Sequence, residues 1–218
     1  LMRRQFNDDA RLRWFIGDVR DAQRLELAME RVEWVIHAAA LKRIEVGAYN
    51  PGEMVKTNVI GSQNVIEAAR RQKVAKVLLI SSDKAFEPVS PYGQTKALAE
   101  SLFLTANDIY PHGPRFSIVR YGNVFNSTGS LVPTWKGLIA AGAIAVPVTN
   151  PDCTRFFMRL GEAVELVLGT LATMKGGEVE VPALPAYRVA DMAAAFDMPM
   201  QVGVMPKWEK AHESMADG

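Results

Sequence analysis

The chain has 218 residues but a single cysteine, Cys153, and only three histidines. One cysteine excludes a disulfide within the chain, and no Cys/His cluster has the spacing of a metal site, so we expect no metal and a reducing compartment. The 25 basic and 24 acidic side chains nearly cancel, so no field of one sign would recruit nucleic acid or an anionic membrane. A disulfide scaffold, a structural zinc domain and a polyanion-binding protein are therefore excluded.

Long hydrophobic runs are lacking as well. No stretch approaches the roughly 18 to 20 apolar residues that a membrane-spanning helix needs, and the beginning of the chain, with Arg3, Arg4, Asp8 and Asp9, is not a signal peptide. We therefore expect a cytoplasmic protein without a membrane partner. Hydrophobic residues make up 49% of the chain, which suits one globular unit with a substantial core.

The most informative stretch is the apolar run at residues 76–80, followed by Ser81, Ser82, Asp83 and Lys84. A short run rich in Val, Leu and Ile predicts a buried parallel strand. Open α/β sheets bind their ligands at the carboxyl ends of such strands. The polar side chains after residue 80 are therefore the predicted active site.

Tyr92 and Lys96 stand four residues apart at the start of an amphipathic helix predicted over residues 92–110, so they share one helical face. An ammonium beside a phenol lowers the pKa of the phenol, and such a pair can remove a proton from a sugar hydroxyl. A solvated Tyr and Lys on an exposed face is the alternative interpretation.

In this combination the chain resembles the extended short-chain dehydrogenases/reductases. The segments 81–85 and 92–96 are similar to those of nucleotide-sugar 4,6-dehydratases of polysaccharide biosynthesis, especially the inverting UDP-N-acetylglucosamine 4,6-dehydratases. The likeness extends to the segments 15–21, 37–42, 56–58, 120–124 and 154–156. The resemblance implies a Rossmann-like α/β fold, a parallel sheet flanked by helices with a small C-terminal substrate-binding part.

The resemblance also implies a set of site residues. The catalytic group is Ser82, Asp83, Lys84, Tyr92 and Lys96. The NAD or NADP side comprises Asp18, Val19, Ala38, Ala39, Ala40 and Lys42 together with Tyr92 and Lys96. The substrate side comprises Lys42, Asn123, Arg155 and Glu209. From the residues alone, Asp18 reads as a turn or cap residue, Lys42 and Arg155 as surface charges, and His37 as a satisfied core histidine.

The activity implied is NAD(P)-dependent dehydration of UDP-GlcNAc to a 4-keto-6-deoxy sugar with inversion at C5. Tyr92 would take the C4 hydroxyl proton, Lys84 the C5 proton, and Asp83 would protonate the departing 6-hydroxyl. An epimerase or reductase needs only Tyr92, Lys96 and a hydroxyl residue. The adjacent Asp83 and Lys84 therefore distinguish a dehydratase from these two activities. A non-catalytic nucleotide-sugar-binding or assembly subunit is the alternative from another class. We also expect a homo-oligomer.

The remaining chain is read as strands at 12–16, 32–38, 116–120 and 178–181, and as helices at 22–31, 51–72, 132–141, 160–174 and 189–196. We divide it into a partial dinucleotide-binding domain, 1–125, and a mainly substrate-binding part, 126–218. None of its 16 glycines forms the G-x-G-x-x-G turn that receives a dinucleotide pyrophosphate. We therefore expect a fold without its first βαβ unit, from a fragment or a degenerate copy, which by itself binds NAD(P) poorly and has little or no dehydratase activity.

Overall fold

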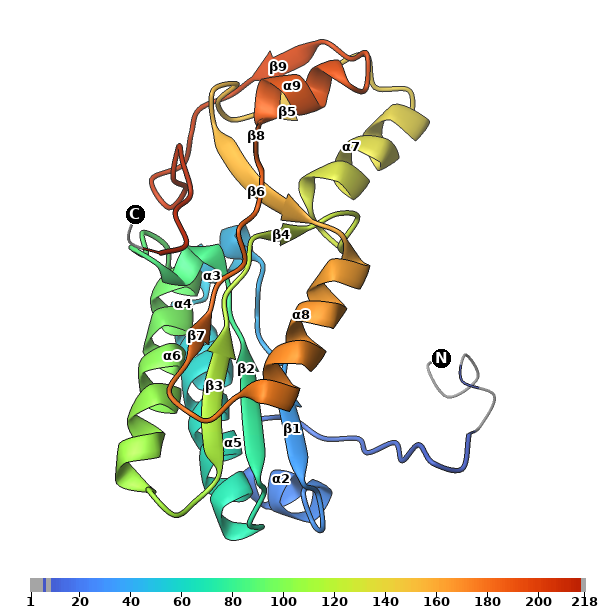
Figure 1. The fold of residues 1–218 in the computed structure, drawn as a ribbon. Helices are drawn as coiled ribbons and strands as arrows, with labels where there is room; N and C mark the ends of the chain where they lie inside the picture. The colour runs from blue at the N-terminus through green and yellow to red at the C-terminus, as the bar shows by residue number, and fades with distance from the viewer. Residues whose placement is uncertain (1–5, 7–8, 217–218) are drawn as a thin grey trace.

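The computed structural model describes residue 6 and residues 9–216. In this part of the chain, four parallel strands form the main sheet in the order β1 (Trp34–His37), β2 (Lys76–Ile80), β3 (Arg115–Val119) and β7 (Val179–Glu180) (Figure 1). Helices α5 (Gly61–Arg71) and α6 (Pro91–Ile109) cover one face, and α8 (Leu160–Thr173) covers the other. The predicted α/β class, a parallel sheet flanked by helices, is confirmed.

Strand β2 is buried because both of its faces have partners. Val77 and Leu79 are fully buried in the cluster formed with α5 and α6, whereas Leu78 packs with Leu171 and Met174 on the side of α8. Side chains of a strand alternate between its two faces. A continuous apolar run is therefore required here, and the prediction of a buried parallel strand is confirmed.

Smaller sheets lie beyond the carboxyl end of the main sheet (Figure 1). Strands β4 (Asn123–Val124), β6 (Thr154–Met158) and β8 (Ala186–Arg188) form one, and β5 (Val146–Val148) pairs with β9 (Met200–Val202). Helices α7 (Leu131–Ala140) and α9 (Val189–Ala194) complete this region, whose core holds Trp135, Cys153 and Phe157. The boundary at residue 125 stays a prediction.

The long helix predicted over residues 51–72 is formed in three pieces. Helix α4 (Pro51–Met54) continues into a π-helical turn, η1 (Val55–Ile60), and then into α5. Single π turns inside helices often occur at functional sites. Here the turn carries the buried Asn58. The short helix α3 (Ile44–Tyr49), which precedes it, was not predicted.

The strand predicted over residues 12–16 is wrong. These residues form no strand, and the Ile16 side chain is 94% exposed. A strand needs a neighbour for its backbone N–H and C=O groups, and the segment stands away from the sheet (Figure 1). The next prediction holds, because Asp21 caps helix α2 (Ala22–Ala28) by accepting a 3.0 Å bond from the Arg24 backbone N–H.

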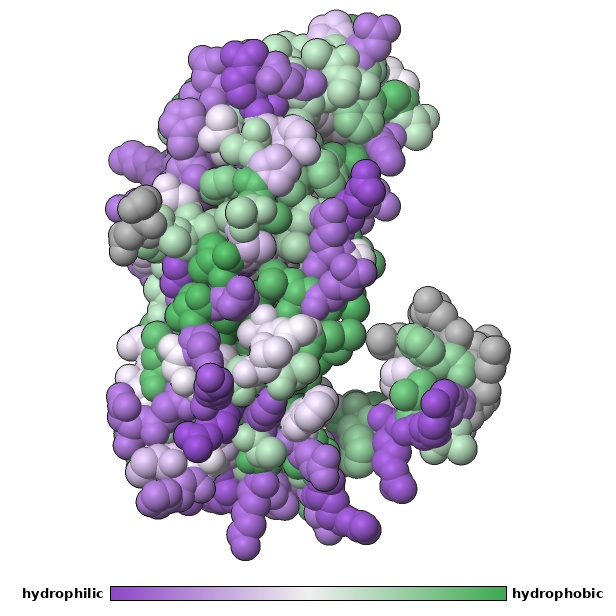
Figure 2. All heavy atoms as spheres, in the orientation of Figure 1, coloured by the Kyte–Doolittle hydropathy of each residue, from purple (hydrophilic) through white to green (hydrophobic). Residues whose placement is uncertain are grey.

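Apolar side chains remain exposed along one flank of the sheet. In the described residues β1 pairs with β2 alone, and its Trp34 and Ile36 are about half exposed. Leu160, Val164 and Leu168 recur at helical spacing on α8 and are also exposed. On the face of the molecule drawn in Figure 2, apolar residues are exposed among polar ones. No helix in the described part of the chain is long and apolar enough to cross a membrane.

Candidate active site

The carboxyl end of β2 turns directly into the predicted catalytic residues. Ser82 caps the short 3-10 helix η2 (Asp83–Ala85), and the Asp83 backbone N–H donates a 3.0 Å bond to the Tyr121 carbonyl beyond β3. Asp83 is buried, with a relative exposure of 1%. The strand end and the turn after it therefore fix the backbone of residues 82–85.

Helix α6 begins against this turn. The Ser90 side chain accepts a 3.0 Å hydrogen bond from the Gly93 N–H. Pro91 occupies the first helical turn, where a backbone N–H would have no acceptor within the helix, so the missing N–H of proline costs nothing. A Cβ at Gly93 would collide with the Lys84 carbonyl oxygen. Glycine is therefore needed at position 93 for the start of the helix to lie next to Lys84.

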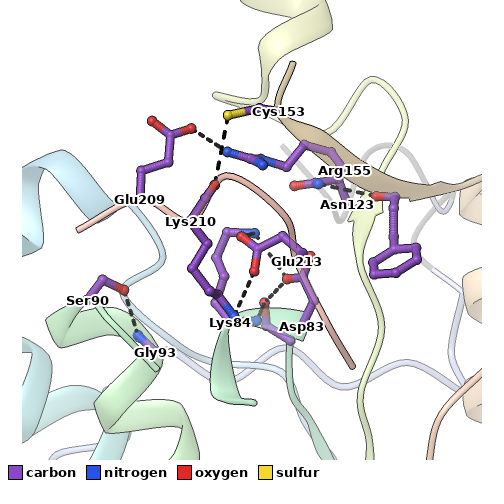
Figure 3. A network of polar contacts seen from close by, with 12 residues as sticks. Asp83, Lys84, Ser90, Gly93, Asn123, Cys153, Arg155, Glu209, Lys210 and Glu213 are labelled. Atoms are coloured by element: carbon purple, nitrogen blue, oxygen red, sulfur yellow. Dashed lines mark hydrogen bonds and ion pairs between the residues drawn. The ribbon is translucent and has the colours of Figure 1, made fainter. Parts of the chain in front are cut away.

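Lys84 lies between two buried carboxylates (Figure 3). Its Nζ is 3.0 Å from Asp83 Oδ1 and 3.5 Å from Glu213 Oε1, and Glu213 Oε2 is 2.9 Å from Lys210 Nζ. Burial lowers the pKa of Lys84, but the charges of Asp83 and Glu213 outweigh burial, so the pKa is raised. Lys84 is therefore an ammonium in this structure.

Asp83 uses only one of its carboxylate oxygens. Oδ1 accepts from the Ser82 hydroxyl at 2.8 Å and from Lys84 Nζ at 3.0 Å, while the buried Oδ2 has no hydrogen-bond partner among the described residues. An unpaired buried carboxylate oxygen is costly. A substrate hydroxyl that donates to Oδ2 would remove this cost.

Tyr92 is buried, which rules out the solvated alternative for this side chain. Burial raises the pKa of its phenol, and the nearby Lys84 ammonium and Ser82 hydroxyl offset this only in part. The lowered pKa that the Tyr92–Lys96 spacing predicted is therefore wrong for this structure. The cation that acts on the phenol is Lys84 rather than Lys96.

Lys96 is also buried, and its Nζ donates a 2.6 Å hydrogen bond to the carbonyl of Ile80, the last residue of β2. Burial lowers the pKa of Lys96 to about 8, with Glu100 opposing the shift. The side chain therefore changes charge close to neutral pH.

Two predicted substrate residues pair with each other at the opposite wall. Arg155 Nη2 is 2.6 Å from Glu209 Oε1, and Arg155 Nη1 donates to the Ala211 carbonyl at 3.0 Å (Figure 3). Together with Lys84 they line a cavity of about 250 Å³, whose other walls are Ile44, Glu45, Val89, Ser90, Pro206, Trp208, Lys210 and Glu213. The site thus joins the end of β2 to the C-terminal segment.

The other two predicted substrate residues lie outside this cavity lining. Asn123 donates its amide to the Phe156 carbonyl at 3.2 Å, which ties β4 to β6, and Lys42 is exposed in the loop after β1. Asn123 is therefore a structural contact in this conformation.

The residues predicted for the cofactor differ in exposure and contacts. Ala38 and Ala39 are exposed just beyond β1, and Ala40 is half-buried. Val19 packs closely against Gly61 of α5. Asp18, predicted at the adenine end, is held by Arg20, whose hydrogen bonds lower the Asp18 pKa to about 2.

Polar contacts behind the site support its loops. Asn58 accepts from the Leu41 N–H at 2.8 Å and donates to Thr95 Oγ1 at 3.0 Å, which connects the loop after β1 to α6. His37 is 3.0 Å from Ser62 Oγ, and burial lowers its pKa to about 4, so it is neutral. The interpretation of His37 as a satisfied core histidine is confirmed.

Three charged residues of the site were not selected from the sequence: the buried Glu100 and Glu213 and the partly buried Lys210. Glu100 accepts from Ser81 and from Arg120 Nη2, the latter at 2.6 Å, and Arg120 Nη1 donates to the Met215 carbonyl at 2.6 Å. Lys210 and Glu213 stand three residues apart in the segment that also holds Glu209. The resemblance of residues 209–213 to a segment of the family was the available signal, but nothing in it indicated Lys84 as the partner.

The family model described as "Polysaccharide biosynthesis protein" matches residues 2–215. The chain belongs to this family. A UDP-N-acetylglucosamine 4,6-dehydratase (inverting) of Campylobacter jejuni subsp. jejuni serotype O:23/36 (strain 81-176) is 44% identical over 213 residues, which cover 96% of this chain and 64% of that protein. A UDP-glucose 4-epimerase of Rickettsia akari (strain Hartford) is 38% identical and is covered over 54% of its length. The chain therefore spans between about half and two thirds of these relatives.

Solved structures agree with this family. Pen from Bacillus thuringiensis has a TM-score of 0.95 and 33% identity, over 99% of this chain and 71% of that one. The dTDP-glucose 4,6-dehydratase DesIV from Streptomyces venezuelae, solved with NAD and TYD bound, has a TM-score of 0.91 over 98% and 73% of the chains. At 19% identity, DesIV supports the fold alone.

Proposed function

We propose that this member of the family forms the catalytic centre of a lyase, an NAD(P)-dependent UDP-GlcNAc 4,6-dehydratase that inverts C5. The observation that carries the proposal is the contact of Asp83 with Lys84 at the end of β2, 3.0 Å between Oδ1 and Nζ. The similarity to an inverting dehydratase supports it. An epimerase, the activity in the name of the Rickettsia relatives, has no step that needs this second acid–base pair.

Ala38, Ala39, Tyr92 and Lys96 would hold the nicotinamide end of NAD or NADP, which when bound would accept and return hydride. Tyr92 would first lose its phenolic proton to solvent, and as the phenolate it would take the C4 hydroxyl proton while C4 is oxidised to a ketone. Its pKa is raised in this structure, so a cation must approach the phenol during the reaction, and the nearby Lys84 ammonium already acts in that direction.

Elimination then requires a base for the C5 proton and an acid for the 6-hydroxyl. Lys84 starts as an ammonium and Asp83 as a carboxylate, and one proton moved between them leaves a neutral amine and a carboxylic acid. This transfer follows the oxidation at C4, and the neutral pair is favoured because the bound sugar has displaced water and burial penalises charge. Lys84 then takes the C5 proton and Asp83 gives its proton to the departing hydroxyl.

This elimination restores the charges of Lys84 and Asp83, and return of the hydride to C6 with protonation of C5 from the opposite face would complete the inverted product. The C5–H and C6–O bonds break, a C5–C6 double bond forms, one water leaves, and Lys84 and Asp83 return to ammonium and carboxylate. The Asp83 Oδ2 atom, buried and unpartnered, suits the contact with the 6-hydroxyl. Arg155 and Glu209, at the far wall of the cavity, would open their mutual pair to bind the nucleotide, Arg155 through phosphate oxygens. Asn123 and Lys42 would join them only after a rearrangement of their loops.

The test is incubation of the chain with UDP-GlcNAc and millimolar NAD or NADP in deuterated water, followed by nuclear magnetic resonance. A 4-keto-6-deoxy product with deuterium at C5 supports the proposal. In the Lys84→Met variant we expect oxidation at C4 without loss of water, and equal loss of both steps would show that Lys84 has another role. Binding of UDP-GlcNAc with no NAD(P) binding and no turnover even at millimolar cofactor would favour a non-catalytic subunit. A homo-oligomer and a cytoplasmic location belong to the same proposal.

A further inference from the structure

Four charged groups, two buried carboxylates and two partly buried lysines, alternate in sign across the site. Asp83, Lys84, Glu213 and Lys210 follow one another at separations of 3.0, 3.5 and 2.9 Å. Their side chains are 1%, 17%, 3% and 14% exposed. Two of them belong to the turn after β2 and two to the C-terminal segment, residues 206–216 (Figure 3).

The C-terminal segment is fastened on both sides of Glu213. Lys210 Nζ donates to the Phe86 carbonyl at 2.9 Å, just beyond η2, and the Met215 carbonyl accepts from Arg120 at 2.6 Å. His212 Nδ1 is 3.0 Å from Thr154 Oγ1 on β6. The Glu213 carboxylate is therefore held at Lys84 by contacts that precede and follow it.

We infer that Glu213 is a positioning residue for the proposed reaction, because its carboxylate holds the Lys84 ammonium and so sets how readily Lys84 becomes a neutral base. Lys210 acts through Glu213 by neutralising part of its charge. The catalytic consequence rests on the proposed function, whereas the effect on the charge of Lys84 does not. The C-terminal segment thereby becomes part of the acid–base centre.

Other charged and titratable groups that act on Lys84 or line its cavity are Asp83, Tyr92, Glu45, Arg155, Glu209 and Lys210. Arg155 and Glu209 pair with each other at 2.6 Å, so their charges cancel in part at Lys84. Asp83 and Glu213 are the carboxylates in ionic contact with it. Removal of Glu213 is therefore expected to leave Lys84 with one negative neighbour instead of two.

Glu213 and Lys210 have opposite predicted effects. Without the Glu213 charge the ammonium loses stabilisation, so the pKa of Lys84 falls; an opposite charge at this range is worth about 1 to 3 pKa units. Without the Lys210 charge Glu213 acts on Lys84 more strongly, and a like charge is also removed, so the pKa rises. A segment that served only packing would not produce shifts of opposite sign.

The experiment is a titration of the chain labelled with ¹³C and ¹⁵N at the lysine ε positions, followed by nuclear magnetic resonance from pH 8 to 12.5, because the pKa of Lys84 is already raised above its ordinary value of 10.5. The Lys84→Met spectrum identifies the Lys84 signal. We expect its midpoint to fall by about one unit or more in Glu213→Gln and to rise in Lys210→Met. Lys207→Met is the matched control, because Lys207 is exposed on the same segment, and it should leave the midpoint unchanged.

An unchanged midpoint in Glu213→Gln, or shifts of the same sign in both variants, would overturn the inference. If circular dichroism shows that Glu213→Gln does not fold, the Lys210→Met variant is the test. An unchanged or lower Lys84 midpoint in that variant would refute the inference. The titration needs neither substrate nor cofactor. If the midpoints shift as expected but the chain forms no keto sugar, the proposed function is refuted and the inference stands. If the chain is active but the midpoints do not shift, the inference is refuted and the proposed function stands.

Discussion

Lys96 donates a 2.6 Å hydrogen bond to the carbonyl of Ile80, so the lysine that the sequence pairs with Tyr92 is anchored to the last residue of β2. Its ammonium is buried beside the strand end, and Glu100 is the carboxylate that stabilises its charge. The contact aligns α6 with the residues that leave β2. The first effect of Lys96 on Tyr92 is therefore to fix where α6 lies, and the effect of its charge on the phenol comes second.

Stability should rise with pH above neutrality because of Lys96. Its pKa is lowered from 10.5 to about 8, so between these values the unfolded chain keeps a proton that the folded chain has released. The free energy of unfolding therefore rises with pH in this window, by about 3 kcal/mol at most, since one pKa unit corresponds to about 1.4 kcal/mol. Urea denaturation at pH 7.5, 9 and 10.5 measures it. Lys96→Met should show a smaller rise, and parallel curves for both proteins would contradict the prediction.

Gly93→Ala should damage the site through backbone contact. The added Cβ meets the Lys84 carbonyl oxygen, and overpacking of this kind costs about 1 to 3 kcal/mol of stability. Gly137→Ala is the control, because nothing lies within 4 Å of a Cβ at that position of α7; it should be neutral or stabilising by up to about 1 kcal/mol. Thermal denaturation compares the two, and equal effects would show that the Gly93 contact relaxes freely.

Tyr92→Phe should lower turnover by about 10²-fold or more, the usual scale for a positioned acid–base group. The ring keeps its packing in the buried site, so the affinity for UDP-GlcNAc should change little. Steady-state kinetics at saturating cofactor separates the two effects. Near-normal turnover would instead indicate that Asp83 or a water is the base for the C4 hydroxyl.

The chain alone should bind NAD or NADP weakly, with a dissociation constant above about 1 µM. Backbone N–H groups of a glycine turn at a helix start normally receive the pyrophosphate, and none of the 16 glycines forms that motif. Calorimetry with each dinucleotide measures the affinity. Micromolar or tighter binding would contradict this prediction and reveal a cofactor site that the sequence pattern does not show.

Local patterns alone determined the elements that carry the site. An apolar run followed by Ser, Asp and Lys is enough to predict β2 and the side chains at its end, because burial on both faces and the geometry of parallel sheets leave few alternatives. The 3.6-residue period likewise placed Tyr92 and Lys96 on one face of α6. Their burial, which depends on packing, was not in that pattern.

Only the tertiary structure decided what these residues contact and how they are charged. The pairing of Lys84 with Glu213 joins segments far apart in the chain, and no sequence period encodes such a contact. The direction of a pKa shift depends on burial and on every nearby charge. The spacing of Tyr92 and Lys96 predicted a lowered pKa for Tyr92, whereas burial raises it. Residues 12–16 failed as a strand for the same physical reason: a strand exists only with a neighbour, and hydrogen bonds between strands are made in three dimensions.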